Sequence, residues 1–261
     1  MITVASFVSH FIAAQPHFSF PSNAVANEEI VLRWIHIVAG IIWIGLLYFV
    51  ILVGTPALKA LEDVTRRKVY PVLMSRAMLW IRWSALVTVL VGLRYYMILL
   101  QIDAQNSGQP GLLGRWLGEW FLVWLVAYAI IYALQMPFGG PLANGWLRAI
   151  LIAVVVIAAS WVTLAWNAGP DVSNAHLSIS VGGGLGLIML LNAWGIIWRV
   201  QKRMIQWTRA SVENGTPIPE KAAKMLQFST FAARTAFWLS FPMLFLMAAA
   251  EHYPFLSSIG H

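Results

Sequence analysis

The sequence predicts an all-α protein, a polytopic membrane bundle of about six transmembrane helices with an interfacial arm at its N-terminus. The first observation is composition: of 261 residues, 60% are hydrophobic and only 10% are charged, and the mean hydropathy is +0.73. A soluble domain of this size carries about 25% charged residues, and folding alone cannot hide such an apolar excess. The second is that the apolar residues form long runs without the alternation of a membrane β-barrel.

The membrane-spanning stretches can be placed in order along the chain. A helix that crosses a bilayer needs about 20 mostly apolar residues. Six stretches meet this requirement: 29–53, 76–101, 115–136, 145–167, 177–200 and 224–250. We therefore expect a helical bundle over 29–255, followed by a short extracytoplasmic tail at 256–261.

The first 28 residues are not predicted to form another membrane-spanning helix. They contain apolar side chains but are interrupted by Pro16 and Pro21, and they lack the basic start of a signal peptide. We interpret residues 1–28 as an extracytoplasmic arm that lies at the membrane interface.

Basic residues are concentrated on one side of the predicted bundle. The connections after the first, third and fifth stretches, with their flanks, contain Lys59, Arg66, Arg67, Lys68, Arg76, Arg148, Arg199, Lys202, Arg203, Arg209, Lys221 and Lys224. Because cytoplasmic loops are rich in lysine and arginine, this side is predicted to be cytoplasmic and both termini extracytoplasmic. The same rule explains the net charge of +7 without a nucleic-acid partner, and anionic lipids are expected to meet these loops.

His36 is the main candidate for a cofactor ligand. It lies about seven residues, or roughly 10 Å, into the first stretch, on the same helical face as Trp43. An ionisable residue inside a membrane is a functional hypothesis by default. A buried neutral imidazole in such a setting is suited to axial ligation of haem iron, and it is equally suited to a hydrogen bond with a neighbouring helix.

The fifth stretch opens with Gly182, Gly183, Gly184 and Gly186. Glycines without side chains allow either another helix or a flat macrocycle to approach the backbone closely. We therefore include Gly183 and Gly184 with His36 and Trp43 in a candidate pocket for haem b. The absence of cysteine excludes covalently attached c-type haem, iron–sulfur clusters and thiolate metal sites.

Arg115 and Glu119 lie four residues apart at the outer end of the third stretch. This i,i+4 spacing predicts an ion pair on one helical face, which we expect to be buried. The alternative role for Glu119 is a carboxylate in a proton relay or a quinone site.

Several segments resemble the membrane-embedded N-terminal domain of the bacterial urate oxidase (urate hydroxylase) family. The similar segments are LRWIHIVAGIIWIG at 32–45, LWIRW at 79–83, VGGGLGLIM at 181–189, QKRM at 201–204, PMLFLM at 242–247 and HYP at 252–254. The resemblance covers residues 30–255 and implies a bundle suited to b-type haem in a bacterial inner membrane. In that family, purine oxidation is coupled to a fused cytochrome c domain.

The chain departs from the family pattern at the positions that matter most for chemistry. It has no CxxCH, Ser180 replaces a histidine before the glycine run, and Thr235, Ala236 and Phe237 replace a second histidine and two asparagines. His176 and His252 are predicted to lie too close to the outer surface to replace the lost ligand opposite His36. Urate oxidation is therefore not expected.

These observations predict an integral membrane subunit of a larger bioenergetic complex, acting as an accessory scaffold beside other membrane subunits. No Ser–His–Asp arrangement, paired carboxylate site or phosphate loop is visible, so no catalytic activity of its own is expected. The alternatives are a b-type cytochrome that passes electrons with His36 as haem ligand, and a solute transporter, for which no inverted repeat is evident.

Overall fold

The computed structural model describes residues 20–137, 139–169 and 171–256. The chain divides into two units, 1–31 and 32–261. In the first unit, the Oδ1 atom of Asn23 accepts a hydrogen bond from the Val25 amide at 2.9 Å, which caps the first helix. Helix α2 (Ala24–Tyr48) thus begins within the part of the chain expected to form the interfacial arm. Residues 1–19 of the predicted arm, and 257–261 of the predicted tail, lie outside the described residues.

The first half of the second unit consists of long helices joined by short connections. Helix α2 continues through a π-helical turn, η1 (Phe49–Gly54), into α3 (Thr55–Ala60), and α4 (Asp63–Asn106) and α5 (Leu112–Gln135) follow. The π-turn ends at Gly54, two residues before Pro56, whose missing backbone N–H removes one hydrogen bond from the helical ladder.

The second half contains three further long helices. A short 3₁₀ turn, η2 (Gly140–Ala143), leads into α6 (Gly145–Asn167), and α7 (Asn174–Asn192) continues through the π-turn η3 (Ala193–Ile197) into α8 (Trp198–Asn214). The last helix is α9 (Lys221–Ala249). The described residues contain six continuous helices long and apolar enough to cross a membrane. The all-α prediction is confirmed, and the chain has the architecture of a multi-pass membrane protein.

Helix α7 is the central helix of the second unit. In its apolar window 72% of the residues are buried, against 17% to 33% in the other five spanning helices. Glycine residues allow the neighbouring helices to approach α7 closely. A Cβ on Gly182 would lie 3.2 Å from Leu246 and Met247 of α9, and a Cβ on Gly184 would overlap the Trp124 indole of α5. The glycine run therefore allows α5 and α9 to pack closely against α7.

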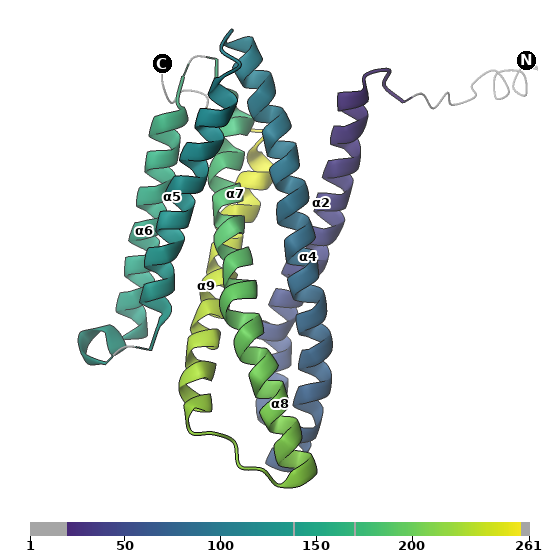
Figure 1. Ribbon diagram of the computed structural model, residues 1–261, viewed down its shortest axis with the longest axis vertical. Helices are drawn as coiled ribbons and strands as arrows, with labels where there is room; N and C mark the ends of the chain where they lie inside the picture. Colours follow the sequence, from purple (N-terminus) through teal and green to yellow (C-terminus); the bar gives the residue numbers. More distant parts are fainter. Residues whose placement is uncertain (1–19, 138, 170, 257–261) are drawn as a thin grey trace, which may run out of the picture. The chain divides into compact units, whose positions relative to one another are not determined.

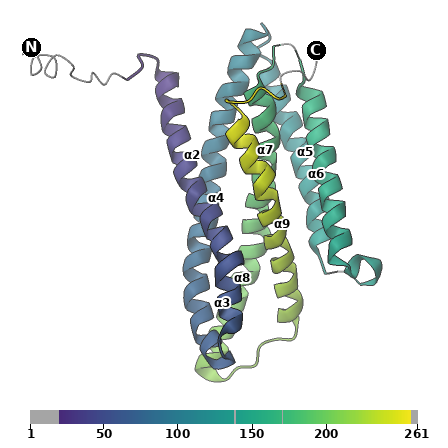
Figure 2. The same ribbon diagram turned by 180° about the vertical axis from the view of Figure 1, so that it is seen from behind.

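The connections of the second unit lie at two ends, which we name for reference (Figures 1 and 2). The α3–α4 junction, the α5–α6 connection and the α8–α9 loop lie at the basic end, at the bottom of Figure 1. The α4–α5 and α6–α7 connections and the end of α9 lie at the opposite end.

Candidate functional site

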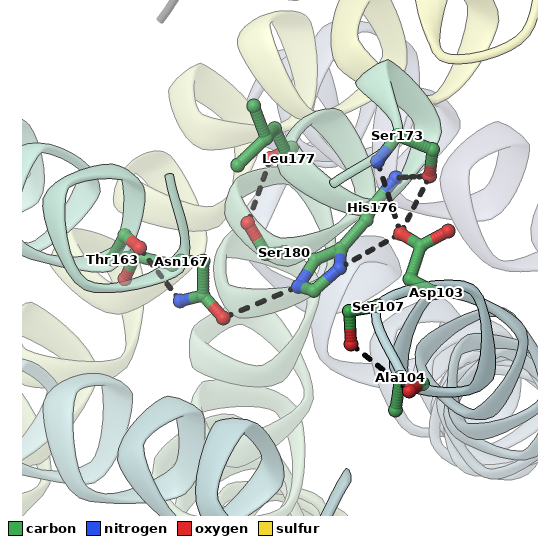
Figure 3. Close-up of polar contacts among 9 residues, drawn as sticks. All are labelled: Asp103, Ala104, Ser107, Thr163, Asn167, Ser173, His176, Leu177 and Ser180. Atoms are coloured by element: carbon green, nitrogen blue, oxygen red, sulfur yellow. Dashed lines mark hydrogen bonds and ion pairs between the residues drawn. The ribbon is translucent and has the colours of Figure 1, made fainter. Parts of the chain in front are cut away.

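The most extensive buried polar cluster lies at the opposite end and is centred on His176 of α7 (Figure 3). The His176 side chain is fully buried. Its Nδ1 atom lies 3.1 Å from Oδ2 of Asp103 in α4, and its Nε2 atom lies 3.2 Å from Oδ1 of Asn167 in α6. One imidazole therefore joins three helices.

The surrounding hydrogen bonds fix the orientation of this cluster. The Ser173 backbone N–H and hydroxyl both donate to Oδ2 of Asp103, at 3.0 and 2.8 Å. The Asn167 amide nitrogen donates to the Thr163 carbonyl at 2.7 Å, which directs its oxygen toward the imidazole. Both ring nitrogens of His176 thus face oxygen acceptors, an arrangement complementary to the imidazolium form, in which both nitrogens donate.

A second group of polar contacts lies near the same end of the bundle. Arg33 of α2 forms an ion pair with Glu251 at 2.7 Å, and the Tyr95 hydroxyl of α4 donates to the other oxygen of that carboxylate at 2.7 Å. The Arg33 guanidinium also lies over the Tyr95 ring, 5.9 Å from its centroid. These side chains link α2 and α4 to the residues that follow α9.

His36 occupies a half-buried position between α2 and α4. Its Nδ1 atom lies 2.8 Å from the Thr88 carbonyl, and its ring lies against Gly92, where an added Cβ would come within 2.7 Å of it. The bond to Thr88 makes Nδ1 the donor and leaves Nε2 with its lone pair. Nε2 has no hydrogen-bond partner among the described residues, which is the arrangement of a histidine able to ligate a metal.

The other members of the candidate haem pocket do not form a cradle with His36. Trp43 is buried in the core. The surface of Gly184 is covered by the Trp124 indole, and Trp120 lies beside Gly183. The space that a macrocycle would need above the glycines is filled by tryptophan, so the four residues do not fit a haem pocket of the expected form.

The two positions considered for a second haem ligand are also engaged. Ser180 is fully buried, its hydroxyl donates to the Leu177 carbonyl at 2.7 Å, and its own carbonyl accepts from the Trp120 indole at 2.7 Å. His176 uses both ring nitrogens in the cluster described above. It lies in the first turn of α7, near the opposite end of the bundle, and is buried there by neighbouring helices.

Arg115 and Glu119 form the ion pair that their spacing predicts. The Nε atom of Arg115 lies 2.7 Å from Oε1 of Glu119. The expectation of a buried pair is wrong, however, because the Arg115 side chain is 63% exposed and only that of Glu119, at 22%, is largely covered.

A large cavity of about 2220 Å³ opens toward the basic end of the bundle. Its lining comes from η1, α3, α4, α6, α7, α8 and α9, together with Gln135 at the end of α5. Most of the lining is apolar, and its charged residues are Lys59, Asp63, Arg66, Arg67, Arg148 and Arg234. The sequence does not predict this cavity, because its lining comes from helices far apart along the chain.

Comparisons with protein-family models, with curated proteins and with solved structures find no match to this chain.

Proposed function

We propose that this protein is an integral membrane subunit that acts as a scaffold in a larger, bioenergetic complex, with no turnover of its own. The observation that carries the proposal is an aromatic stripe on α9, formed by Trp238, Phe241 and Phe245. Their exposed fractions are 69%, 47% and 62%. The spacing of three and four residues places them on one helical face, which is the pattern of a helix that offers anchors to a partner helix.

The depth of the stripe supports a protein partner rather than a lipid boundary. Trp238 lies 17 residues after Lys221, the first residue of α9, which is roughly 25 Å along the helix axis. Tryptophan in a lipid-facing position prefers the membrane interfaces. In contrast, large aromatic side chains are enriched in the cores of protein interfaces and dominate their energetics.

The buried cluster at the opposite end supports a scaffold role. His176, Asp103 and Asn167 direct their hydrogen bonds at one another and at the backbone, so they stiffen the bundle and present no reacting group to a substrate. A rigid bundle that carries an exposed aromatic stripe on α9 is suited to holding another membrane segment in a fixed position.

Photocrosslinking in native membranes tests the proposal. A photoreactive amino acid replaces Trp238 or Phe245 in the stripe and, as a matched control, Leu122 on the exposed face of α5. We expect a discrete adduct with one membrane polypeptide from the stripe positions and none from the control. A chain that purifies alone in mild detergent, and that gives no adduct at either stripe position, would overturn the proposal.

The second candidate function is that of a b-type cytochrome that passes electrons. The observation that favours it is that the Nδ1 atom of His36 is bonded to the Thr88 carbonyl, while its Nε2 atom has no hydrogen-bond partner among the described residues. An absorption spectrum of the protein purified from its native host decides between the two functions. A Soret band that His36→Ala removes supports the cytochrome, and a spectrum without the band excludes it.

A further inference from the structure

Gln135, the last residue of α5, is an unpartnered amide at the edge of the large cavity. Its side chain is fully buried and lines the cavity. Neither its oxygen nor its nitrogen has a hydrogen-bond partner within the described residues. Because a buried polar group without a partner is destabilising, this amide indicates that a polar group is supplied from the cavity.

Two arginines lie on the same side of the cavity. Arg148, in the first turn of α6, donates through Nη1 to the Met136 carbonyl at 2.9 Å, and its guanidinium lies 4.3 Å from the centroid of Phe231 in α9. Its Nε atom is buried and has no partner within the described residues. Phe231 therefore marks the position along α9 that contacts the first turn of α6.

Arg234 follows Phe231 by three residues and so lies one helical turn away on the same side of α9. It lines the cavity and makes no hydrogen bond or ion pair with any described residue. We call Gln135, Arg148 and Arg234 the basic mouth of the cavity.

The charge of the basic mouth is uncompensated. Asp63 is the single acidic residue among the described residues that line the cavity, and it pairs with Arg66 and Arg67. The first turn of α6 lies at this mouth, and a helix N-terminus adds a partial positive charge. The mouth is therefore complementary to an anion.

The walls beyond the mouth are apolar and long. They include Ile152, Val156 and Trp161 of α6 and Leu239 of α9. The cavity volume of about 2220 Å³ also exceeds the roughly 300–1,000 Å³ of typical small-molecule pockets. An occupant that fits must combine an anionic head with a large apolar body.

We propose that the cavity binds an anionic phospholipid. Its phosphate is held by Arg148, Arg234 and the Gln135 amide, and its acyl chains lie along α6 and α9. Basic pockets between transmembrane helices are suited to anionic headgroups, and the membrane leaflet supplies such lipids directly. Trp238 also lines the cavity but is assigned to the proposed partner interface, and the lipid site does not depend on that interface.

The test is lipid retention by the purified full-length chain. The protein is exchanged into vesicles of phosphatidylcholine with or without phosphatidylglycerol and extracted again, and the lipid that remains bound is identified by native mass spectrometry. We expect selective retention of phosphatidylglycerol, and a loss of roughly tenfold or more in the variant Arg148→Gln/Arg234→Gln, which lacks two charge contacts. The matched control, Arg209→Gln, removes an exposed arginine of α8 that does not line the cavity and should retain the lipid.

A second variant separates lost binding from lost folding. Arg148→Lys/Arg234→Lys keeps both charges and should retain most of the phosphatidylglycerol, whereas a binding loss caused by misfolding would appear as altered circular dichroism and gel-filtration behaviour. Equal retention of the two lipids by the parent chain would overturn the proposal, as would unchanged retention by the glutamine variant. Displacement of the lipid by inorganic phosphate alone would instead identify a free-phosphate site, and a polypeptide found in the cavity would identify a protein site. Either outcome also overturns the proposal.

Discussion

The Nδ1 atom of His176 lies 3.1 Å from the Oδ2 atom of Asp103, although the two residues are 73 positions apart in the sequence. Both side chains are buried, and the contact joins the central helix α7 to α4. Removing one member of a buried polar pair of this kind is destabilising, since the other member loses its hydrogen-bond partner.

The first prediction concerns this pair. His176→Ala and Asp103→Ala should each lower the free energy of unfolding by about 1–3 kcal/mol, because each leaves a buried polar group without its partner. The double variant should be less destabilised than the sum of the two single variants, because it leaves neither group unpaired. Thermal unfolding of the purified protein in detergent measures all four members of this double-mutant cycle.

His252 provides the matched control for this cycle, since it is an exposed histidine near the same end of the bundle. His252→Ala should change stability by no more than about 0.5 kcal/mol. Strictly additive losses at His176 and Asp103 would contradict the coupling that the geometry indicates.

The second prediction compares two glycines of α7. A Cβ on Gly184 would overlap the Trp124 indole, which is itself fully buried, whereas a Cβ on Gly186 meets nothing within 4 Å. Gly184→Ala should therefore destabilise the protein by about 1–3 kcal/mol through overpacking. Gly186→Ala should be neutral or slightly stabilising, because alanine favours helix more than glycine does. Equal unfolding temperatures for the two variants would contradict the close packing of α5 on α7.

The features that the sequence predicts correctly are those that depend on local pattern. Apolar runs mark the membrane-spanning parts of the six helices, and the four-residue spacing of Arg115 and Glu119 brings them together on α5. The helices extend beyond the apolar runs, as α4 does from Asp63 to Asn106. Hydropathy marks the part of a helix that lipid surrounds, whereas the extensions are stabilised by packing against neighbouring helices in polar surroundings.

The features that the sequence does not reveal depend on how helices are rotated about their axes. The partners of His176 come from α4 and α6, and no spacing along the chain predicts that Asp103 and Asn167 point toward it. The glycine run of α7 is compatible with either a helix or a macrocycle until the position of Trp124 is known. The cavity near Gln135 likewise depends on how helices far apart in the sequence pack around it.

The third prediction concerns Gln135 in protein freed of lipid. Its amide is buried without a partner within the described residues, so Gln135→Leu removes an unsatisfied polar group while keeping a side chain of similar size. We expect the delipidated variant to be as stable as the parent or more stable by up to about 1–3 kcal/mol. As a matched comparison, Gln201 accepts a hydrogen bond from the Tyr70 hydroxyl at 2.5 Å, so Gln201→Leu should be destabilising. Destabilisation by Gln135→Leu equal to that by Gln201→Leu would show that the Gln135 amide has a partner.

The fourth prediction concerns orientation in the membrane. The chain contains no cysteine, so a single introduced cysteine reports the side on which it lies without a background signal. Thr216 lies exposed in the α8–α9 loop at the basic end, and Gln109 lies exposed in the α4–α5 connection at the opposite end. Because basic connections remain in the cytoplasm, a membrane-impermeant maleimide should label Gln109→Cys in intact cells and Thr216→Cys only after permeabilisation. The unsubstituted chain should remain unlabelled throughout. The reverse pattern would place the basic end outside the cell and would remove the cytoplasmic leaflet as the source of an anionic lipid for the cavity.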